Sequence, residues 1–283
     1  MPVVNVKQLF GVYETVFDPS CKLVTSPFFS ATVLAVVRFL VALYTTTTLV
    51  IIMVSDGVED GDAGRNFSYF TTLTYIGICS YYWAAFTQSA SYVARKTRGG
   101  SGYPLQQWPK WLQSLHLILG TSIITFPILV TVVFWVLLAN SESLGSPMLI
   151  WRNVSVHALN SVFCFFEMLF THSPRPRWFF LVPMIIILGG YCGLAYVTEA
   201  TQGFYTYPFL NPDKGPILAG YIVGIALAEC IIFSVVWGLM TFKAKYFPVA
   251  RHVDAGTSRD DTPELDYSMD EHEKVSKDSK DFV

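Results

Sequence analysis

The sequence predicts an all-α membrane protein, a bundle of six transmembrane helices with both termini in the cytosol. Hydrophobic residues make up 52% of the 283 positions and charged residues only 14%, whereas a typical soluble domain has about a quarter of its residues charged. The mean hydropathy is +0.44. Six separate stretches also reach the length of about 20 apolar residues that a membrane-spanning helix needs.

The six stretches are joined by short links rich in turn-forming residues, such as SDGVEDGDAG and SPRPR. The second stretch is the least apolar of the six. No uninterrupted apolar core of a cleavable signal peptide precedes the first stretch, which is therefore expected to act as the insertion signal. The predicted spans are approximately residues 28–54, 67–91, 111–139, 149–171, 178–199 and 215–242.

The distribution of Lys and Arg predicts the orientation, because cytosolic loops carry an excess of these residues. Eleven of them lie before the first span, in the second and fourth links, or directly after the last span. The first, third and fifth links hold only three, which are Arg65, Arg152 and Lys214. This asymmetry predicts that residues 1–27 form a cytosolic or interfacial segment and that 28–245 form the transmembrane domain.

Residues 246–283 are predicted to form a disordered acidic cytosolic tail. From residue 254 onward the chain holds ten acidic and four basic residues and few apolar ones, a composition that cannot offset the entropy of ordering a chain. The sequence does not identify a partner for this tail. The basic residues elsewhere are scattered between apolar runs, which argues against a nucleic-acid-binding protein.

A polar stripe runs along the predicted fourth span. His157 lies about eight residues from the outer end of that span, roughly 12 Å deep at helical rise. Asn160, Ser161 and Cys164 follow at helical spacing and are expected on the same face. Such a stripe is expected to face the bundle interior. It is equally typical of a hydrogen-bonded contact that only holds helices together.

The predicted second span brings hydroxyl groups to a similar depth. It enters from the same side as the fourth span with the sequence NFSYFTTLTYIG, which contains Thr71, Thr72 and Thr74. Threonines in membrane helices usually bond to their own backbone. However, a hydroxyl becomes an effective nucleophile when a neighbouring base takes its proton, and histidine is the common base for that task. The shared depth therefore indicates a candidate threonine–histidine pair.

Other polar residues of the spans have simpler explanations. Arg38 of the first span is expected either to snorkel to the membrane interface or to pair, with Glu167 as one candidate partner. Glu167 can also reach Arg175 or Arg177. Glu199 at the outer end of the fifth span, and Tyr207 in the aromatic stretch GFYTYPFL, are candidate rim residues. No hydrolase elbow, zinc motif or phosphate-binding loop is present, so no cofactor and no metal site is predicted.

The motifs NVSVHALNSVFCFFEM, THSPRP and GFYTYPFLNPDKGP, in this order and spacing, resemble the FAR-17a/AIG1 family of androgen-induced-gene and androgen-dependent TFPI-regulating proteins. FSYFTTLTYIG and TFPILVTVVFW resemble its second and third spans. The resemblance covers roughly residues 30–245, and the chain is most similar to fungal-type members. Animal members carry histidines before the glycine that corresponds to Gly203, where this chain has Glu199 and Ala200.

The resemblance implies a six-span hydrolase of the endoplasmic reticulum or another endomembrane, which cleaves lipid esters such as fatty acid esters of hydroxy fatty acids. Matched by position, the nucleophile would be Thr72 and the base His157, with Thr71 and Thr74 as alternative nucleophiles. Asn160 and Ser161 are expected to support the imidazole or the oxyanion, and the ester is expected to enter from the bilayer. The alternative is a non-enzymatic membrane protein, either a transporter of protons or small solutes, or a regulatory or assembly factor.

Overall fold

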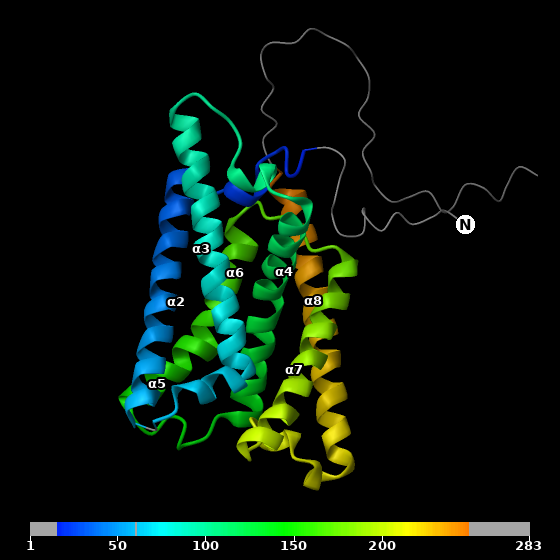
Figure 1. Ribbon diagram of the computed structural model, residues 1–283. Coiled ribbons are helices and arrows are strands. Elements are labelled where there is room, and N and C mark those ends of the chain that lie inside the picture. The colour runs from blue at the N-terminus through cyan, green and yellow to red at the C-terminus, as the bar shows by residue number, and fades with distance from the viewer. Residues whose placement is uncertain (1–15, 60, 249–283) are drawn as a thin grey trace, which may run out of the picture. The chain divides into compact units, whose positions relative to one another are not determined.

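The computed structural model describes residues 16–59 and 61–248 of the chain. Every regular element within these ranges is helical, which confirms the all-α fold (Figure 1). Short 3₁₀ turns lie between the long elements. One π-helical segment, Phe134–Leu138, follows α4, and another, Ser155–Leu159, lies between α5 and α6. The α-helices are α2 (Ala31–Glu59), α3 (Phe70–Thr97), α4 (Lys110–Val133), α5 (Pro147–Val154), α6 (Asn160–Phe170), α7 (Leu181–Gln202) and α8 (Pro216–Tyr246).

Five of the six predicted spans correspond to helices that are long and apolar enough to cross a membrane. These are Ala31–Val58, Lys110–Leu138, Pro147–Phe170, Trp178–Gln202 and Pro216–Tyr246. The predicted second span corresponds to α3, a helix of 28 residues that is less apolar than the five others and is not in that set. The number of six spans and the position of both termini in the cytosol therefore stay predictions.

Local signals explain where several helices begin and end. Ser146 is the N-cap of α5 and accepts a hydrogen bond from the backbone N–H of Leu149, with Pro147 at the first helical position. Pro216 has the same position in α8. Helix α7 ends at Gln202 and is followed by Gly203 as its C-cap, whose φ of 74° lies in the left-handed region that favours glycine.

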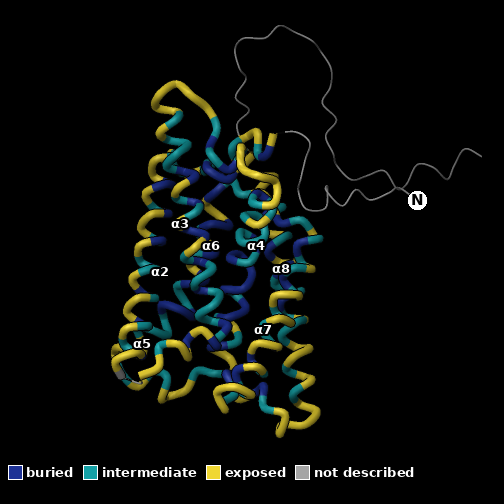
Figure 2. Tube along the Cα trace, in the orientation of Figure 1, coloured by how far each residue is buried: buried dark blue, intermediate teal, exposed yellow. Residues whose placement is uncertain are grey.

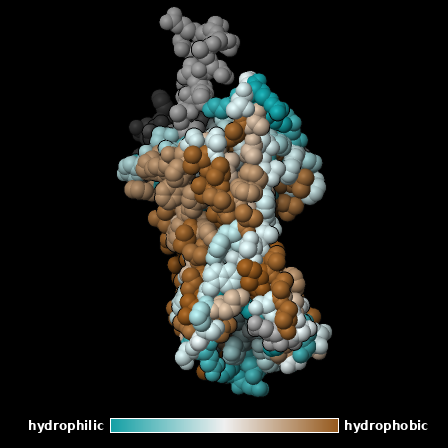
Figure 3. Space-filling view, turned by 90° about the vertical axis from the view of Figure 1, so that its left-hand side faces the viewer, coloured by the Kyte–Doolittle hydropathy of each residue, from teal (hydrophilic) through white to brown (hydrophobic). Residues whose placement is uncertain are grey.

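The helices differ in how much of each is buried. In the most apolar stretch of each helix, 50% of the α4 residues are buried, against 17% in α7 and in α8. In Figure 2 the buried residues lie on the inward faces of α3, α4 and α6, and α7 and α8 expose most of their length. Figure 3 shows hydrophobic side chains over the middle of one face and hydrophilic ones at both ends. This pattern matches a helix bundle embedded in lipid.

The links gather at the two ends of the bundle as the predicted topology requires. The link between α3 and α4, the segment after α6 and the end of α8 lie at the upper end in Figure 1. The ends of α2 and α7 lie at the opposite end, together with the start of α3. The predicted cytosolic links thus share one end of the molecule, and His157 belongs to the other half. The predicted tail falls almost entirely on residues outside the described ranges.

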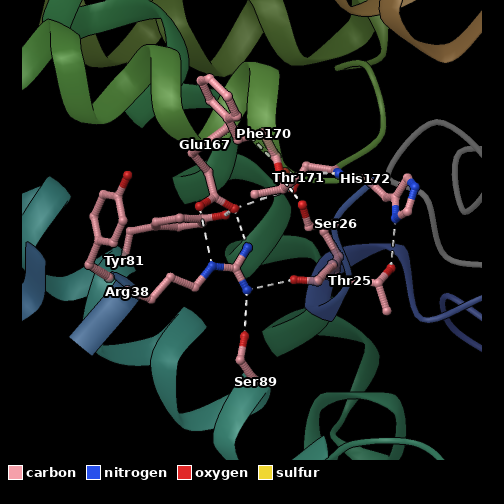
Figure 4. A network of polar contacts seen from close by, with 12 residues as sticks. Thr25, Ser26, Arg38, Tyr81, Ser89, Glu167, Phe170, Thr171 and His172 are labelled. Carbon is pink, nitrogen blue, oxygen red and sulfur yellow. Dashed lines mark hydrogen bonds and ion pairs between the residues drawn. The ribbon is translucent and has the colours of Figure 1, made fainter. Parts of the chain in front are cut away.

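A buried ion pair joins the helices near the predicted cytosolic end. Arg38 of α2 pairs with Glu167 of α6, and both side chains are at most 1% exposed. Arg38 also donates to the Ser89 hydroxyl of α3 at 2.6 Å and to the Leu23 carbonyl at 2.9 Å, while Tyr81 donates to Glu167 at 2.9 Å (Figure 4). Because lipid offers no partner to a charge, this network confirms the pairing of Arg38 with Glu167.

Candidate functional site

A cavity of about 470 Å³ opens near the ends of α2 and α5 and the start of α3. Its lining includes Thr71, Thr72, His157 and Tyr207, which the sequence analysis selected separately. The volume lies within the range of about 300–1,000 Å³ that is usual for ligand pockets. The structure therefore brings the candidate nucleophile, its competitor Thr71, the candidate base and one predicted rim residue to a single cavity.

His157 lies in the middle of the π-helical segment Ser155–Leu159. Such segments are frequent at functional sites because they displace side chains from the regular helical register. The imidazole stacks on the ring of Phe134, with 3.7 Å between ring centroids and 2° between planes. Phe134 itself begins the other π-helical segment, which is closed by the hydrogen bond from the Ala139 N–H to the Phe134 carbonyl at 2.8 Å.

Packing, rather than hydrogen bonding, fixes this imidazole. His157 is 8% exposed, and its Nδ1 has no hydrogen-bond partner among the described residues. Trp135 donates from its indole to the backbone carbonyl of His157 at 3.2 Å and leaves the ring unbonded. The imidazole therefore lacks the bonded carboxylate of a Ser-His-Asp triad, and its orientation depends on the flat contact with Phe134.

The three candidate threonines differ in what their hydroxyls contact. The Thr74 hydroxyl donates to the backbone carbonyl of Thr71 at 2.9 Å, the usual arrangement in a membrane helix. The Thr71 hydroxyl lies 3.5 Å from the Tyr207 hydroxyl. The Thr72 hydroxyl has no hydrogen-bond partner within the described residues. Of the two that line the cavity with His157, Thr72 alone has an unbonded hydroxyl.

Asn160 and Ser161 do not support the imidazole as expected from their spacing. Ser161 lies 2.7 Å from the Thr131 hydroxyl and donates to the Pro127 carbonyl at 3.1 Å. Asn160 accepts a hydrogen bond from Thr131 at 3.1 Å. The π-helical segment that contains His157 and ends just before Asn160 breaks the regular i+3 and i+4 spacing, and the Asn160 and Ser161 side chains contact α4. Their observed contacts hold two helices together.

A polar cluster at the mouth of the cavity was not identified from the sequence. Arg152 donates to both carboxylate oxygens of Asp56, at 2.6 and 2.8 Å. Asn66 donates to Asp56 at 2.6 Å and accepts from Arg152 at 3.1 Å. The sequence showed only single charges in links that are far apart along the chain. Asn66, part of a glycosylation sequon, is 4% exposed and engaged in this cluster, so it is poorly accessible to glycosylation.

Glu199, the other predicted rim residue, is not among the residues that line this cavity. It is half-buried near the end of α7, and its backbone carbonyl accepts the hydrogen bond from Gly203 that ends the helix. Among the described residues no group of three or more His, Cys, Asp or Glu side chains is arranged to hold a metal ion. The chemistry available at the cavity is thus that of hydroxyls, one imidazole and the polar cluster at the mouth.

With this geometry described, comparison with protein families supplies the identification. The model of the FAR-17a/AIG1-like protein family matches residues 31–242, from the start of α2 almost to the end of α8. The chain belongs to the FAR-17a/AIG1-like family. The matched range contains every residue of the site described above, which confirms the resemblance seen in the sequence. No curated protein and no solved structure matches this chain.

Proposed function

We propose that this FAR-17a/AIG1-like protein is a lipid-ester hydrolase with Thr72 as its nucleophile and His157 as its base. One observation carries the proposal: an unbonded hydroxyl and a buried, unbonded imidazole line the same cavity, in a protein with several membrane-spanning helices. Neither transport nor a role in assembly requires an unbonded hydroxyl and an unbonded imidazole in one cavity. By contrast, the Thr74 and Asn160 side chains form hydrogen bonds within the helix bundle, as expected of residues with only a structural role.

The proposed reaction has two steps. His157 takes the proton of Thr72 Oγ1 as this oxygen attacks the ester carbonyl, and the proton then passes to the leaving alkoxide as the carbon–oxygen bond breaks. The products of this step are the free alcohol and an acyl-threonine ester. A water molecule then gives a proton to the same imidazole and attacks the acyl carbonyl. The bond between the acyl carbon and Thr72 Oγ1 breaks, the imidazole returns the proton to this oxygen, and the fatty acid is released.

The other parts of the cavity have supporting roles in this proposal. Tyr75 lies one helical turn from Thr72 and also lines the cavity, and its buried hydroxyl is assigned as the donor to the oxyanion, a role typically worth about 3–4 kcal/mol. The cluster of Asp56, Asn66 and Arg152 keeps the mouth polar and lets water reach the acyl-threonine. The ester enters from the bilayer.

Further details extend the proposal beyond the family assignment. By resemblance, the substrates are fatty acid esters of hydroxy fatty acids or similar lipids, the compartment is the endoplasmic reticulum or another endomembrane, and the chain is a fungal-type member. Six spans with both termini in the cytosol would place the cavity in the outer half of the membrane. The acidic tail has no assigned partner, and no cofactor is involved in the reaction.

The proposal is tested by lipid-ester turnover of purified variants. Thr72→Ala and His157→Ala are each expected to lower kcat by roughly 10²-fold or more, because each removes a partner of the proton transfer. The matched control is Thr74→Ala on the same helix, which is expected to stay near wild type because its hydroxyl only bonds to its own backbone. Thermal unfolding confirms that each variant is folded. Wild-type turnover in folded Thr72→Ala and His157→Ala proteins would contradict the proposal.

A further inference from the structure

A second cavity, of about 290 Å³, lies next to the candidate site between α4, α7 and α8. Four of its lining residues, Thr71, Phe134, Leu138 and Tyr207, also line the first cavity. The two spaces thus share a wall, and that wall contains the aromatic ring on which His157 stacks. A ligand that extends past these shared residues would occupy both cavities.

The second cavity is almost entirely apolar. Its further lining includes Leu129, Val130, Ile185, Leu188 and Ile225. Two of its polar side chains are already engaged: the Tyr191 hydroxyl bonds to the Ser68 carbonyl and to Thr206, both at 3.1 Å, and the Tyr207 hydroxyl lies 3.5 Å from that of Thr71. An apolar cavity does not hold ordered water. Hydrocarbon is therefore the chemistry that it fits.

The position of the cavity gives such a ligand a route from the membrane. Helices α7 and α8 bury only 17% of their most apolar stretches, the lowest share among the membrane-spanning helices, and each contributes to the lining. Small residues, Gly189 of α7 and Ala226 of α8, lie in this part of the wall. A hydrocarbon chain in the bilayer thus meets two largely exposed helices beside the cavity.

We propose that this second cavity, the acyl pocket, binds the fatty acyl chain of the ester while the polar cavity receives the alcohol part. This inference rests on the proposed function, which places the ester carbonyl of the substrate beside the residues that the two cavities share. It adds that the acyl pocket determines the acyl-chain length that the enzyme accepts. The ligand class is a single extended hydrocarbon chain with its ester group at the Tyr207 end.

Gly189 allows the pocket to be filled without disturbing the helix. Gly189 lines the pocket, and a Cβ atom added there meets no atom within 4 Å, so Gly189→Leu adds bulk at the pocket wall without a steric clash. Gly190→Leu is the matched control, since its Cβ also meets nothing within 4 Å and Gly190 does not line the pocket. The assay compares kcat/KM for 4-nitrophenyl palmitate with that for 4-nitrophenyl butyrate.

Gly189→Leu is expected to lower kcat/KM for the palmitate ester by about tenfold or more, since even one methylene in an apolar pocket changes kcat/KM by about 10–200-fold. The butyrate ester should be cleaved within about twofold of the wild-type rate, and Gly190→Leu should leave both values unchanged. Unchanged palmitate turnover in the Gly189→Leu variant would overturn the acyl pocket. An equal loss for both esters would also overturn it, because it would show general damage to the site.

A binding experiment separates failure of this inference from failure of the proposed function. Thr72→Ala protein in detergent is labelled with a photoreactive palmitate analogue, and the modified peptides are mapped. Saturable labelling of the α7 and α8 peptides that line the pocket, competed by palmitate and weakened by Gly189→Leu, supports the pocket even if no variant cleaves an ester. Labelling that is unaffected by Gly189→Leu would reject the pocket, even if turnover depends on Thr72.

Discussion

At the scale of single residues, the site depends on how His157 is held. In a Ser-His-Asp triad a carboxylate orients the imidazole through a hydrogen bond. Here the described residues provide the buried Nδ1 with no such partner, and the ring instead lies flat on Phe134. With only 3.7 Å between the ring centroids, the imidazole cannot tilt without clashing with the Phe134 ring. This contact favours one ring orientation, and Phe134 is therefore a positioning residue.

Replacing Phe134 by leucine tests this role. The side chain stays apolar but loses the flat face, so Phe134→Leu is expected to lower kcat for ester cleavage by about tenfold, a factor that corresponds to about 1.4 kcal/mol in the barrier. The control is Phe126→Leu, which changes a buried phenylalanine of α4 that lines neither cavity. That variant should unfold more easily than wild type but retain kcat. Equal losses of kcat in both variants would show that the stack has no specific role.

The sequence predicted part of this site and missed the rest for identifiable reasons. Depth along two spans was enough to associate Thr72 with His157, because it depends only on helical rise and orientation. The distinction between Thr72 and its neighbours required their hydrogen bonds, which the sequence does not reveal. The roles expected for Asn160 and Ser161 assumed an unbroken helix. The π-helical segment Ser155–Leu159 removes that regularity, and no residue pattern in the sequence predicts such a segment.

At the scale of helices, the Arg38 network holds the end of the bundle opposite the candidate site. It joins α2, α3 and α6 through Arg38, Ser89, Tyr81 and Glu167. Lys243 extends the connection to α8, since its ammonium group donates to the carbonyls of Met168 and Thr171 at 2.7 and 2.9 Å. These bonds satisfy backbone acceptors at the end of α6, which would otherwise lack partners.

Removing one member of the ion pair should destabilise the bundle strongly. Arg38→Met leaves Glu167 as an uncompensated buried charge, and breaking such a pair costs about 3–5 kcal/mol. The double variant Arg38→Met with Glu167→Met should recover much of this loss, because neither charge then remains. Thermal unfolding in detergent measures both effects, with the exposed Lys96→Met as the control. A double variant less stable than Arg38→Met would contradict this explanation.

The helices themselves were more predictable than the site. The apolar stretches predicted the five helices that are long and apolar enough to cross a membrane, and the pairing of Arg38 with Glu167 was among the expected contacts. The helix boundaries differ by several residues. Helix α3 continues to Thr97, beyond the predicted end at residue 91, because basic residues at its C-terminus stabilise the helix dipole and do not interrupt the helix.

At the scale of the whole molecule, the two neighbouring cavities differ in chemistry. The one that contains His157 has a charged and polar mouth, whereas the acyl pocket is hydrocarbon-lined and lies beside the helices that are least buried. The sequence could not predict either cavity, because cavities depend on how side chains from distant segments meet. An ester that spans both environments at once is the substrate that this arrangement fits.

The most direct test of the central claim identifies the residue that forms a covalent bond. Purified wild-type protein is treated with an alkyl fluorophosphonate, digested, and analysed by mass spectrometry for the modified peptide. We expect the adduct on Thr72, with His157→Ala abolishing the modification and Thr74→Ala leaving it intact. A protein that cleaves lipid esters while its adduct lies on another residue, or that stays fully labelled after His157→Ala, would contradict the threonine–histidine mechanism.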